Sequence, residues 1–446
     1  MFFKHQIAKS PETNKIFSDF LKALQLDISD THDVMLAMSY LRRIEFICYQ
    51  DDIGAKLDLL ETIRRLFIGD AESIYALLVD FVVENDYLGK NIIANTLNNY
   101  LLHHGYRLRK LSQDERILPR ILELNNDFEA YFSPIGGGFI PRNEIDKCIT
   151  YILDGKSVIL HGEAGYGKSG CVLGVMRSLC EQNIPVLAIK LDRRTPKDTA
   201  QKYGESLGLP ASPIHCLNAV SNTHCVLILD QLDAIRWTNI HNRTAIDVCR
   251  ELIREAKNIN YDETTSLSIL LVCRTFDYEN DSTIKSLFHK DNPHENIWKE
   301  IKVAYLDEDI VKKLTAPYYA NFSSRLKQLL RIPNNLFIWS KLDDGHKSLS
   351  YASTVDLIKG LWNQLCEKCE QHGIPYTEIN GLKLTLVDKI TETKKQSVPD
   401  FLMQTFPPVA VNFAISQGIL LRTENTISFT HQSFYDYFLV EKLLSN

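Results

Sequence analysis

The sequence predicts an α/β fold in which a parallel β-sheet, covered by helices on both faces, is flanked by helical regions. In the middle of the chain, the β-branched runs SVILHG, IPVLAIKLD, HCVLILD, LSILLVCR and EIKVAYL alternate with helix-length segments. This alternation is typical of a parallel sheet with crossover helices. On both sides of this part, apolar residues recur at the three- and four-residue spacing of helices. Near the end, ILLRT and TISFT predict a β-hairpin.

The chain of 446 residues is too long for one ordinary hydrophobic core, so we expect several parts. Residues 1–130 are expected to form an all-helical region, 131–306 the sheet core, 307–350 a helical lid and 351–446 a winged-helix domain built around the hairpin. At residues 133–138, SPIGGG predicts a flexible joint. The helical region shows no catalytic cluster, and its role as effector, sensor or docking surface stays open.

Composition and charge restrict the class of protein. Hydrophobic residues make up 45% of the chain and charged residues 24%, as in folded globular proteins. The formal net charge of -6 gives no overall basic field, which argues against a constitutive DNA-binding protein. The apolar stretch at residues 74–83 is interrupted by Asp80 and is too short to span a membrane. The start MFFKHQIAKS lacks the apolar core of a secretory signal, so we expect a cytoplasmic protein with reduced cysteines.

A phosphate-binding loop is predicted at residues 162–169, which read GEAGYGKS and match the pattern G-x-x-x-x-G-K-S. The segment follows the strand SVILHG and opens an apolar helix, as a P-loop does. Glycines let successive N–H groups point inward, and the helix N-terminus favours negative charge. Lys168 is expected to hold the β and γ phosphates and Ser169 to bind Mg²⁺. The nucleotide-contacting residues predicted here are Gly162, Glu163, Ala164, Gly165, Tyr166, Gly167, Lys168, Ser169 and Gly170. We therefore expect ATP or ADP with Mg²⁺ as cofactors.

Two acidic residues stand at the end of the strand HCVLILD and shortly after it. Asp230 ends this strand, where ligands gather in open parallel sheets, and is expected to lie on the Mg²⁺ side of the site. Asp233 is the candidate for polarising the attacking water, because a carboxylate there could reach the γ-phosphate. A plain helix cap for Asp230 and a solvated loop acid for Asp233 are the alternatives.

Arg274 ends the next strand, LSILLVCR, and its guanidinium is expected to sense or stabilise the charge of the γ-phosphate. A structural pairing with Asp277 is the alternative. One strand intervenes between the loop strand and the Asp230 strand, which separates the chain from the simpler kinases. The fold class predicted is therefore an ASCE/AAA-like P-loop core, in the ATPase half of the P-loop class.

Several motifs resemble the STAND branch of P-loop NTPases, which includes NACHT proteins and bacterial antiviral sensors. FIPRNEID resembles the family's segment before the first strand, DQLDA its extended Walker B motif and VCRTFDY its sensor 1 strand end. RIPNN resembles the lid segment with the family's proline, and ISFTHQSFYDYFLVEKLL resembles the winged-helix end of NACHT-type proteins. The resemblance covers residues 135–446 and leaves the first 130 unassigned.

The resemblance implies further nucleotide contacts. It places Ile140, Pro141 and Arg142 beside the adenine and lets Pro333 pack on the base. It also implies that His431 contacts the β-phosphate of ADP and locks a closed state, which an imidazole N–H can do. A buried structural histidine is the alternative.

This chain departs from the family's pattern at three places. Gln231 and Ala234 stand where many relatives have glycine and glutamate, which leaves Asp233 as the candidate base and predicts slow turnover. The lid lacks the glycine often found two places before the proline. Relatives usually continue after the winged helix into long sensor repeats. Either this chain is part of a longer one, or it senses through another subunit or through its own helical region.

The function implied by the resemblance is a regulatory ATPase that switches between an ADP-bound closed state and an ATP-bound state, oligomerises on activation and serves prokaryotic antiviral defence. A protein trigger or a partner effector subunit fits this interpretation. A DNA-binding initiator or loader ATPase is the alternative from another class, because it also joins a P-loop core to a winged helix. A scaffold with a degenerate site is a third, against which the complete set Lys168, Ser169, Asp230 and Arg274 argues.

Cys366 and Cys369 have the spacing of half a zinc site, with His372 nearby. The sequence contains no matching second pair. A helix in which two thiols fall one turn apart explains the spacing equally simply.

Overall fold

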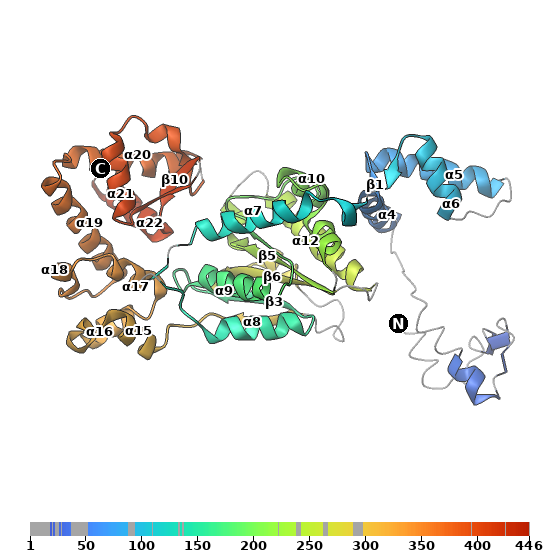
Figure 1. The fold of residues 1–446 in the computed structure, drawn as a ribbon, viewed down its shortest axis with the longest axis horizontal. Helices are drawn as coiled ribbons and strands as arrows, with labels where there is room; N and C mark the ends of the chain where they lie inside the picture. The colour runs from blue at the N-terminus through green and yellow to red at the C-terminus, as the bar shows by residue number, and fades with distance from the viewer. Residues whose placement is uncertain are drawn as a thin grey trace. The chain divides into compact units, whose positions relative to one another are not determined.

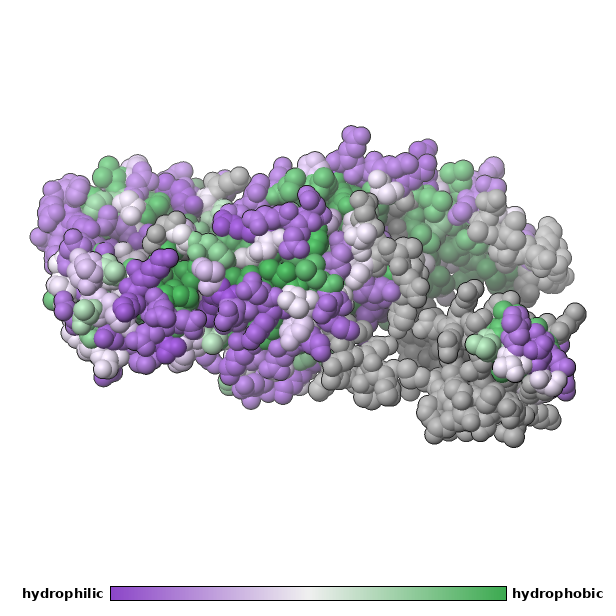
Figure 2. All heavy atoms as spheres, turned by 60° about the horizontal axis from the view of Figure 1, so that its bottom comes forward, coloured by the Kyte–Doolittle hydropathy of each residue, from purple (hydrophilic) through white to green (hydrophobic). Residues whose placement is uncertain are grey.

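The computed structural model describes most of the chain, which divides into two compact units, Met1–Arg107 and Leu108–Asn446 (Figure 1). On the face drawn in Figure 2, hydrophilic residues predominate, with smaller hydrophobic areas between them. No helix among the described residues is both long and apolar enough to cross a membrane. The described residues are 18–19, 21–22, 26–27, 29–36, 52–87, 94–108, 110–132, 134–135, 138–221, 223–237, 242–261, 266–288, 298–393, 395–423 and 425–445.

The first unit is mainly helical, as the sequence predicts. Its elements are α4 (Asp52–Leu66), β1 (Phe67–Ile68), α5 (Ala71–Tyr87), α6 (Ala94–His103) and β2 (Arg107–Leu108). Its core consists of the buried residues Leu60, Ile63, Phe67, Ala71, Ile74 and Leu101. This unit therefore has a small hydrophobic core of its own.

A five-stranded parallel sheet forms the centre of the second unit. Its strands are β3 (Ser157–Gly162), β4 (Val186–Lys190), β5 (His224–Asp230), β6 (Ser266–Arg274) and β7 (Trp298–Lys302). The spatial order is β4-β5-β6-β3-β7, with every pair parallel. The predicted parallel sheet is confirmed. The strand that intervenes along the chain, β4, lies at the edge of the sheet, and β6 is the strand that lies between the loop strand β3 and the Asp230 strand β5. The carboxyl ends of β3, β5 and β6 meet at one edge.

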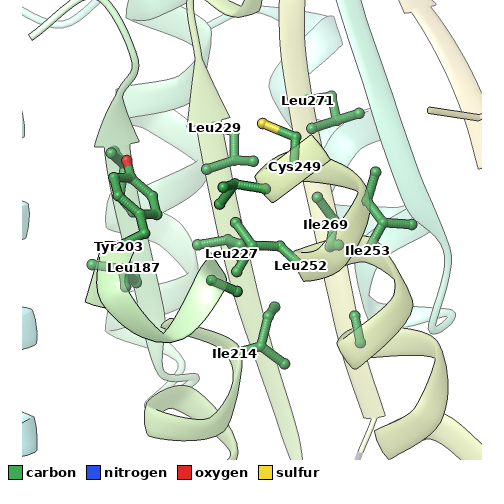
Figure 3. Close-up of a cluster of buried hydrophobic side chains, with 14 of the residues drawn as sticks. Leu187, Tyr203, Ile214, Leu227, Leu229, Cys249, Leu252, Ile253, Ile269 and Leu271 are labelled. Atoms are coloured by element: carbon green, nitrogen blue, oxygen red, sulfur yellow. The ribbon is translucent and has the colours of Figure 1, made fainter. Parts of the chain in front are cut away.

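Helices cover both faces of this sheet because alternate strand residues point to opposite sides. Residues Leu227 and Leu229 of β5 and Ile269 and Leu271 of β6 face the helices α10 (Ala200–Ser206), α11 (Pro213–Val220) and α12 (Asn242–Tyr261) (Figure 3). Their sequence neighbours on the same strands pack on the other face, against α8 (Asn143–Leu153) and α9 (Lys168–Glu181). Both faces are apolar, so the strands read as continuous hydrophobic runs.

Helix α7 (Ile117–Ala130), which follows the 3-10 helix η2 (Leu111–Gln113), covers the edge strand β4. The side-chain amide of Asn125 donates to the carbonyl oxygen of Val186 at 2.7 Å and accepts from the N–H of Ala188 at 2.9 Å. These backbone groups belong to the open side of β4. The compact unit thus begins at Leu108, earlier than the boundary near residue 130 that the sequence suggests, because α7 packs on the sheet. Of the expected joint, Ser133, Gly136 and Gly137 lie outside the described residues.

Short helices follow β5 and β6 and then form the lid. Those after β5 and β6 are η3 (Leu232–Trp237), α13 (Thr275–Asn280) and α14 (Ser282–Lys285). Those of the lid are α15 (Glu308–Thr315), η4 (Tyr318–Asn321), α16 (Ser324–Leu329), α17 (Pro333–Ser340) and α18 (Asp344–Lys347). Helix α17 begins with Pro333 at its first turn, where a missing N–H costs no hydrogen bond.

The winged-helix part shares one hydrophobic core with the lid, which includes Trp339, Trp362 and Phe438. The predicted hairpin is present, and its antiparallel sheet has the order β8-β10-β9. Glu424, at the hairpin turn, lies outside the described residues. The elements are α19 (Thr354–Gln371), α20 (Tyr376–Thr393), β8 (Val398–Pro399), η5 (Asp400–Met403), α21 (Pro408–Ser416), β9 (Leu420–Thr423), β10 (Thr426–Phe429) and α22 (Gln432–Ser445).

Cys366 and Cys369 lie one turn apart on α19, and Cys369 belongs to the hydrophobic core. Among the described residues, no group of three or more His, Cys, Asp or Glu side chains is arranged to hold a metal ion. The geometry around this pair is that of an ordinary helix.

Candidate nucleotide site

The phosphate loop, residues 162–169, joins β3 to α9 and needs its glycines for two reasons. Gly165 has φ 81° and Gly167 has φ 85°, a conformation that side chains rarely adopt. A Cβ atom at Gly165 would also lie 3.0 Å from the Cβ of Asn334, and one at Gly167 would lie 3.1 Å from the Cγ of Pro333. The first turn of lid helix α17 therefore packs directly on the loop.

Lys168 is the first residue of α9, and its ammonium group points back over the loop. Its Nζ donates to the carbonyl oxygens of Gly162 at 2.8 Å and of Glu163 at 3.0 Å. Burial lowers the pKa of Lys168, while the carboxylates of Asp233 and Asp230 oppose that shift. A largely desolvated ammonium at the N-terminus of α9 suits a polyphosphate.

Ser169 and Asp230 form the predicted metal-binding pair. The Ser169 hydroxyl donates to Oδ2 of Asp230 at 2.8 Å, and the N–H of Gln231 donates to Oδ1 at 2.9 Å. Burial raises the pKa of Asp230, which is 1% exposed, and Lys190 and the Ser169 hydrogen bond act in the opposite direction. A hydroxyl and a carboxylate are hard oxygen ligands, so these two residues fit Mg²⁺.

Gln231 adopts φ 62°, in the left-handed region. Glycine adopts this conformation without steric cost, whereas glutamine does not. A side chain in this region costs about 1–2 kcal/mol. The strained turn carries the chain from Asp230 directly into η3, which contains Asp233.

Arg274 connects the candidate base to the winged-helix part. Its Nε lies 2.8 Å from Oδ2 of Asp233, and its Nη2 donates to Oε1 of Gln432 at 3.0 Å. Asp233 is buried, and this burial raises its pKa against the opposing charges of Arg274 and Lys168. Asp233 is therefore a buried, ion-paired carboxylate rather than a solvated loop acid.

His431 lies between β10 and α22 and lines the same cavity as the phosphate loop. The N–H of Ser433 donates to its Nδ1 at 3.1 Å, so the neutral ring carries its proton on Nε2. Burial, followed by the charges of Lys190, Lys168 and Arg274, lowers the pKa of His431 to about 4. At neutral pH the side chain is thus an uncharged N–H donor within the field of three cations.

Arg142 braces the phosphate loop. Its Nη1 donates to the carbonyl oxygen of Tyr166 at 2.7 Å, and its Nη2 donates to Ala304 at 2.5 Å and to Glu144 at 3.0 Å. The side chain is only 7% exposed. These contacts occupy both terminal nitrogens and tie the segment before α8 to the loop and to the chain after β7.

A cavity of about 2080 Å³ brings most of the predicted residues together. Pro141 is exposed and lies outside its lining, as do Gly162 and Tyr166. The ring of Tyr166 contacts Tyr305 instead, with centroids 5.0 Å apart. The predicted residues in the lining are Ile140, Arg142, Glu163, Ala164, Gly165, Gly167, Lys168, Ser169, Gly170, Asp230, Asp233, Arg274, Pro333 and His431.

Sequence reasoning missed several residues of this cavity. Asn334 donates its N–H to the carbonyl of Gly165 at 3.0 Å and its Nδ2 to Ser433 at 3.1 Å. Gln432 holds Arg274. Asn334 follows Pro333, and Gln432 follows His431, both of which were predicted. This adjacency was the signal from which the two residues could have been found. Lys190, the last residue of β4, and Arg193, which follows it, belong to no motif and had no such signal.

No protein-family model matches the sequence, and no curated protein matches it. Among solved structures, the chain is similar to a Walker-type ATPase of Pyrococcus abyssi, with 13% identity and a TM-score of 0.34, over 67% of this chain and 95% of that one. It is similar to a STAND protein with a tetratricopeptide repeat sensor from Pyrococcus horikoshii, with 11% identity and a TM-score of 0.40, over 69% of this chain and 43% of that one. It is also similar to the ORC2 protein of Aeropyrum pernix, with 13% identity and a TM-score of 0.33, over 75% of this chain and 98% of that one.

The position of β6 between β3 and β5, the glycine-dependent loop and the Ser169–Asp230 pair stand together in one unit. On this geometry, the chain has the fold of a P-loop ATPase, with a candidate nucleotide site where β3, β5 and β6 end.

Proposed function

We propose that this protein is an ATP- and ADP-dependent signal-transduction switch of the STAND type that oligomerises on activation. The observation that carries the proposal is the double contact of Arg274, with Asp233 at 2.8 Å and with Gln432 at 3.0 Å. One guanidinium thus joins the reaction site to the first turn of α22.

The γ-phosphate of ATP would compete for this guanidinium. ATP carries an anionic group, absent from ADP, on the side of the loop that Lys168, Asp233 and Arg274 face. Arg274 would pair with that group and release Gln432, which weakens the contact between core and winged helix. A hydrogen bond to a charged group contributes about 1.5–3 kcal/mol, which changes the equilibrium constant between the closed and the open arrangement by roughly 10- to 150-fold. A ligand shifts such a balance only by its differential affinity, and this contact would supply it.

ADP would favour the closed arrangement through a second set of contacts. The proton on Nε2 of His431 is available to a β-phosphate oxygen, since Nδ1 accepts from Ser433. Asn334 joins the loop carbonyl of Gly165 to the same Ser433 hydroxyl. Loop, lid and winged helix would therefore hold ADP together.

Hydrolysis would be slow and regulatory. Asp233 is the candidate for polarising the attacking water, but its carboxylate is paired with Arg274. The pair has to separate before the carboxylate can accept a proton, and burial, which raises the pKa of Asp233, then makes it a better base. Mg²⁺ held by Ser169 and Asp230 would neutralise phosphate charge when bound.

The mass of the full chain in solution tests this proposal. We expect larger assemblies with a non-hydrolysable ATP analogue than with ADP, and no such difference for Lys168→Ala, which removes the loop ammonium. A protein that stays monomeric with either nucleotide would contradict the proposed switch. Action in the cytoplasm, a protein trigger and a role in prokaryotic antiviral defence are further parts of the proposal, which loss of phage protection in a Lys168→Ala strain would support.

A DNA-binding initiator is the second candidate, and the helix before the hairpin argues against it. In helix-turn-helix proteins a recognition helix enters the major groove, and Lys and Arg side chains supply most phosphate contacts. Helix α21, described in full, reads PVAVNFAIS and carries neither lysine nor arginine. Salt-dependent binding of duplex DNA by the full chain would revive this candidate.

A further inference from the structure

Part of the cavity wall is basic and lies beyond the phosphate loop. It is formed by the segment after β4 and by the chain before β8. Its cationic residues are Lys190, Arg193, Arg194, Lys197, Lys202 and Lys395, and we refer to these six as the basic wall. The acidic residues that line the cavity beside them are Asp192, Asp198 and Asp230, the last of which interacts with the charge of Lys190. The cations therefore outnumber the local carboxylates.

Arg193 has donors that lack acceptors. Its guanidinium lies over the ring of Tyr131, with Cζ 5.0 Å from the centroid, and its Nη2 donates to Oγ of Ser428 at 3.3 Å. Nε and Nη1 are buried without a hydrogen-bond partner, and the carboxylate of Asp192 lies 3.5 Å from Nε. A buried unsatisfied donor costs about 1–3 kcal/mol. Nη1 shares the terminal edge of the planar guanidinium with Nη2, whose contact with Ser428 is long, so an anion at this edge would accept from both nitrogens.

The other cations of the basic wall differ in their partners. Arg194 pairs with Asp127 at 2.5 Å. Lys190 lies over the ring of Tyr131, at 5.5 Å, and its charge contributes to the low pKa of His431. Within the described part of the chain, Lys190 and the remaining three lysines of the wall form no salt bridge with a carboxylate. Since the charge of Lys190 also acts on Asp230, the positive charge of the wall that has no carboxylate partner among the described residues is that of Lys197, Lys202 and Lys395.

The cavity has room for a second ligand. Sites for small molecules usually measure about 300–1,000 Å³, whereas this cavity measures about 2080 Å³. A nucleotide on the phosphate loop would therefore leave space along the basic wall. The Arg193–Ser428 hydrogen bond spans from the segment after β4 to β10, so the wing partly covers this space. A covered space favours a small anion over a nucleic acid strand.

We propose that the basic wall is a second anion site, which binds a small phosphorylated molecule through Arg193, Lys190 and the lysines around them. The phosphate groups would lie against the terminal edge of the Arg193 guanidinium, formed by Nη1 and Nη2, in place of the long contact with Ser428. A ligand there would contact the sheet core through Arg193 and the chain before the wing through Lys395, so it would favour the arrangement in which the two parts meet. Binding at this site would not require the phosphate loop, so it can be tested separately from the proposed switch.

Inorganic tripolyphosphate without Mg²⁺ is the probe, titrated calorimetrically into the full-length Lys168→Ala protein. This variant disables the phosphate loop, so a failure of this site is distinguishable from a failure of the switch. We expect one equivalent to bind, with the affinity falling at least tenfold when Arg193→Ala is added and less when Arg193→Lys is added. Lys389→Ala is the matched control, because Lys389 pairs with Glu392 outside the cavity, and it should leave the affinity unchanged.

Three results would overturn the proposal. They are the absence of binding to Lys168→Ala, an affinity that Arg193→Ala does not change, and tighter binding of a single-stranded oligonucleotide that displaces the tripolyphosphate. If Arg193→Ala fails to fold, Lys197→Ala combined with Lys395→Ala replaces it, since both lysines are exposed. That double change should weaken binding severalfold, and an unchanged affinity would also reject the site.

Discussion

The backbone N–H of Asn334 donates to the carbonyl oxygen of Gly165 at 3.0 Å, so lid helix α17 is hydrogen-bonded to the phosphate loop itself. The lid and the loop therefore share one geometry, and a change in one is transmitted to the other. The same asparagine reaches Ser433 of α22 through its side chain.

Gly165→Ala should weaken ADP binding at least tenfold. The new Cβ would meet the Cβ of Asn334 at 3.0 Å in a backbone conformation of φ 81°, so both the loop and the lid contact would shift. Isothermal titration with ADP measures the effect. Gly345→Ala is the control, because Gly345 lies exposed in α18 and has only an ordinary contact at 3.5 Å. Equal ADP affinities of the two variants would contradict the close packing.

Ser169→Ala should remove most of the gain in ADP affinity that Mg²⁺ provides, while the affinity without Mg²⁺ stays close to that of the wild type. The reason is that the Ser169 hydroxyl, hydrogen-bonded to Asp230, is a candidate metal ligand and not a main phosphate contact. Titrations with and without Mg²⁺ separate the two contributions. A loss of equal size in both conditions would show that the serine acts on the loop and not through the metal.

Gln432→Ala should favour the open state roughly tenfold or more, since it removes the neutral partner of a charged guanidinium. We expect ADP alone to permit part of the assembly that otherwise requires the ATP analogue, with little change in ADP stoichiometry. The mass distribution in ADP measures this. Gln404→Ala, at an exposed position after η5, is the control. A mutant that stays monomeric in ADP would argue that Arg274 does not hold the closed state through Gln432.

His431 should make stability depend on pH in an acidic window. Its pKa falls from 6.5 to about 4 in the folded protein, so the unfolded chain binds a proton first as pH decreases. The contribution of the neutral His431 side chain to the free energy of unfolding is fully present above about pH 6.5 and is lost as the pH falls from there to 4. His431→Asn should reduce the loss of stability between pH 7 and pH 5 by on the order of 1 kcal/mol. Denaturant titrations at both pH values test this, and parallel pH dependences of the two proteins would reject it.

Asn125→Ala should destabilise the second unit by about 2–4 kcal/mol. It leaves the carbonyl of Val186 and the N–H of Ala188 without their partner at a buried sheet edge. Chemical denaturation measures the change, and Asn126→Ala on the exposed side of α7 is the matched control. If both variants unfolded at the same denaturant concentration, the edge contact would contribute nothing.

The sequence predicted the parts of the fold that depend on local pattern. Four apolar strands and the glycine-rich loop were readable because their apolar runs and their glycines stand in consecutive residues. The fifth strand, Trp298–Lys302, reads WKEIK and begins before the predicted run EIKVAYL, since it has few apolar residues to mark it. The assignment of α7 to the sheet core was not readable, since an amphipathic helix shows that it has a buried face but not which core buries that face. Its hydrogen bonds to β4 come from one asparagine without a motif.

In the candidate site, too, local motifs predicted some residues, whereas the contacts between distant segments could not be predicted. Motif residues such as Ser169 and Asp230 meet because strand ends in a parallel sheet converge at one edge. The contacts of Arg142 with Tyr166 and of Arg274 with Gln432 join segments far apart in the chain, and no spacing rule encodes them. The adenine contacts expected of Ile140, Pro141 and Pro333 stay predictions.

The cover that α7 places over β4 also limits how copies of this protein can associate. An open strand edge is a template on which another chain can add a strand of its own, and natural proteins protect such edges. Here the side chain of Asn125 already occupies the carbonyl of Val186 and the N–H of Ala188. Any assembly that forms along this side of the sheet must therefore dock through side chains and not by extending the sheet into a neighbour.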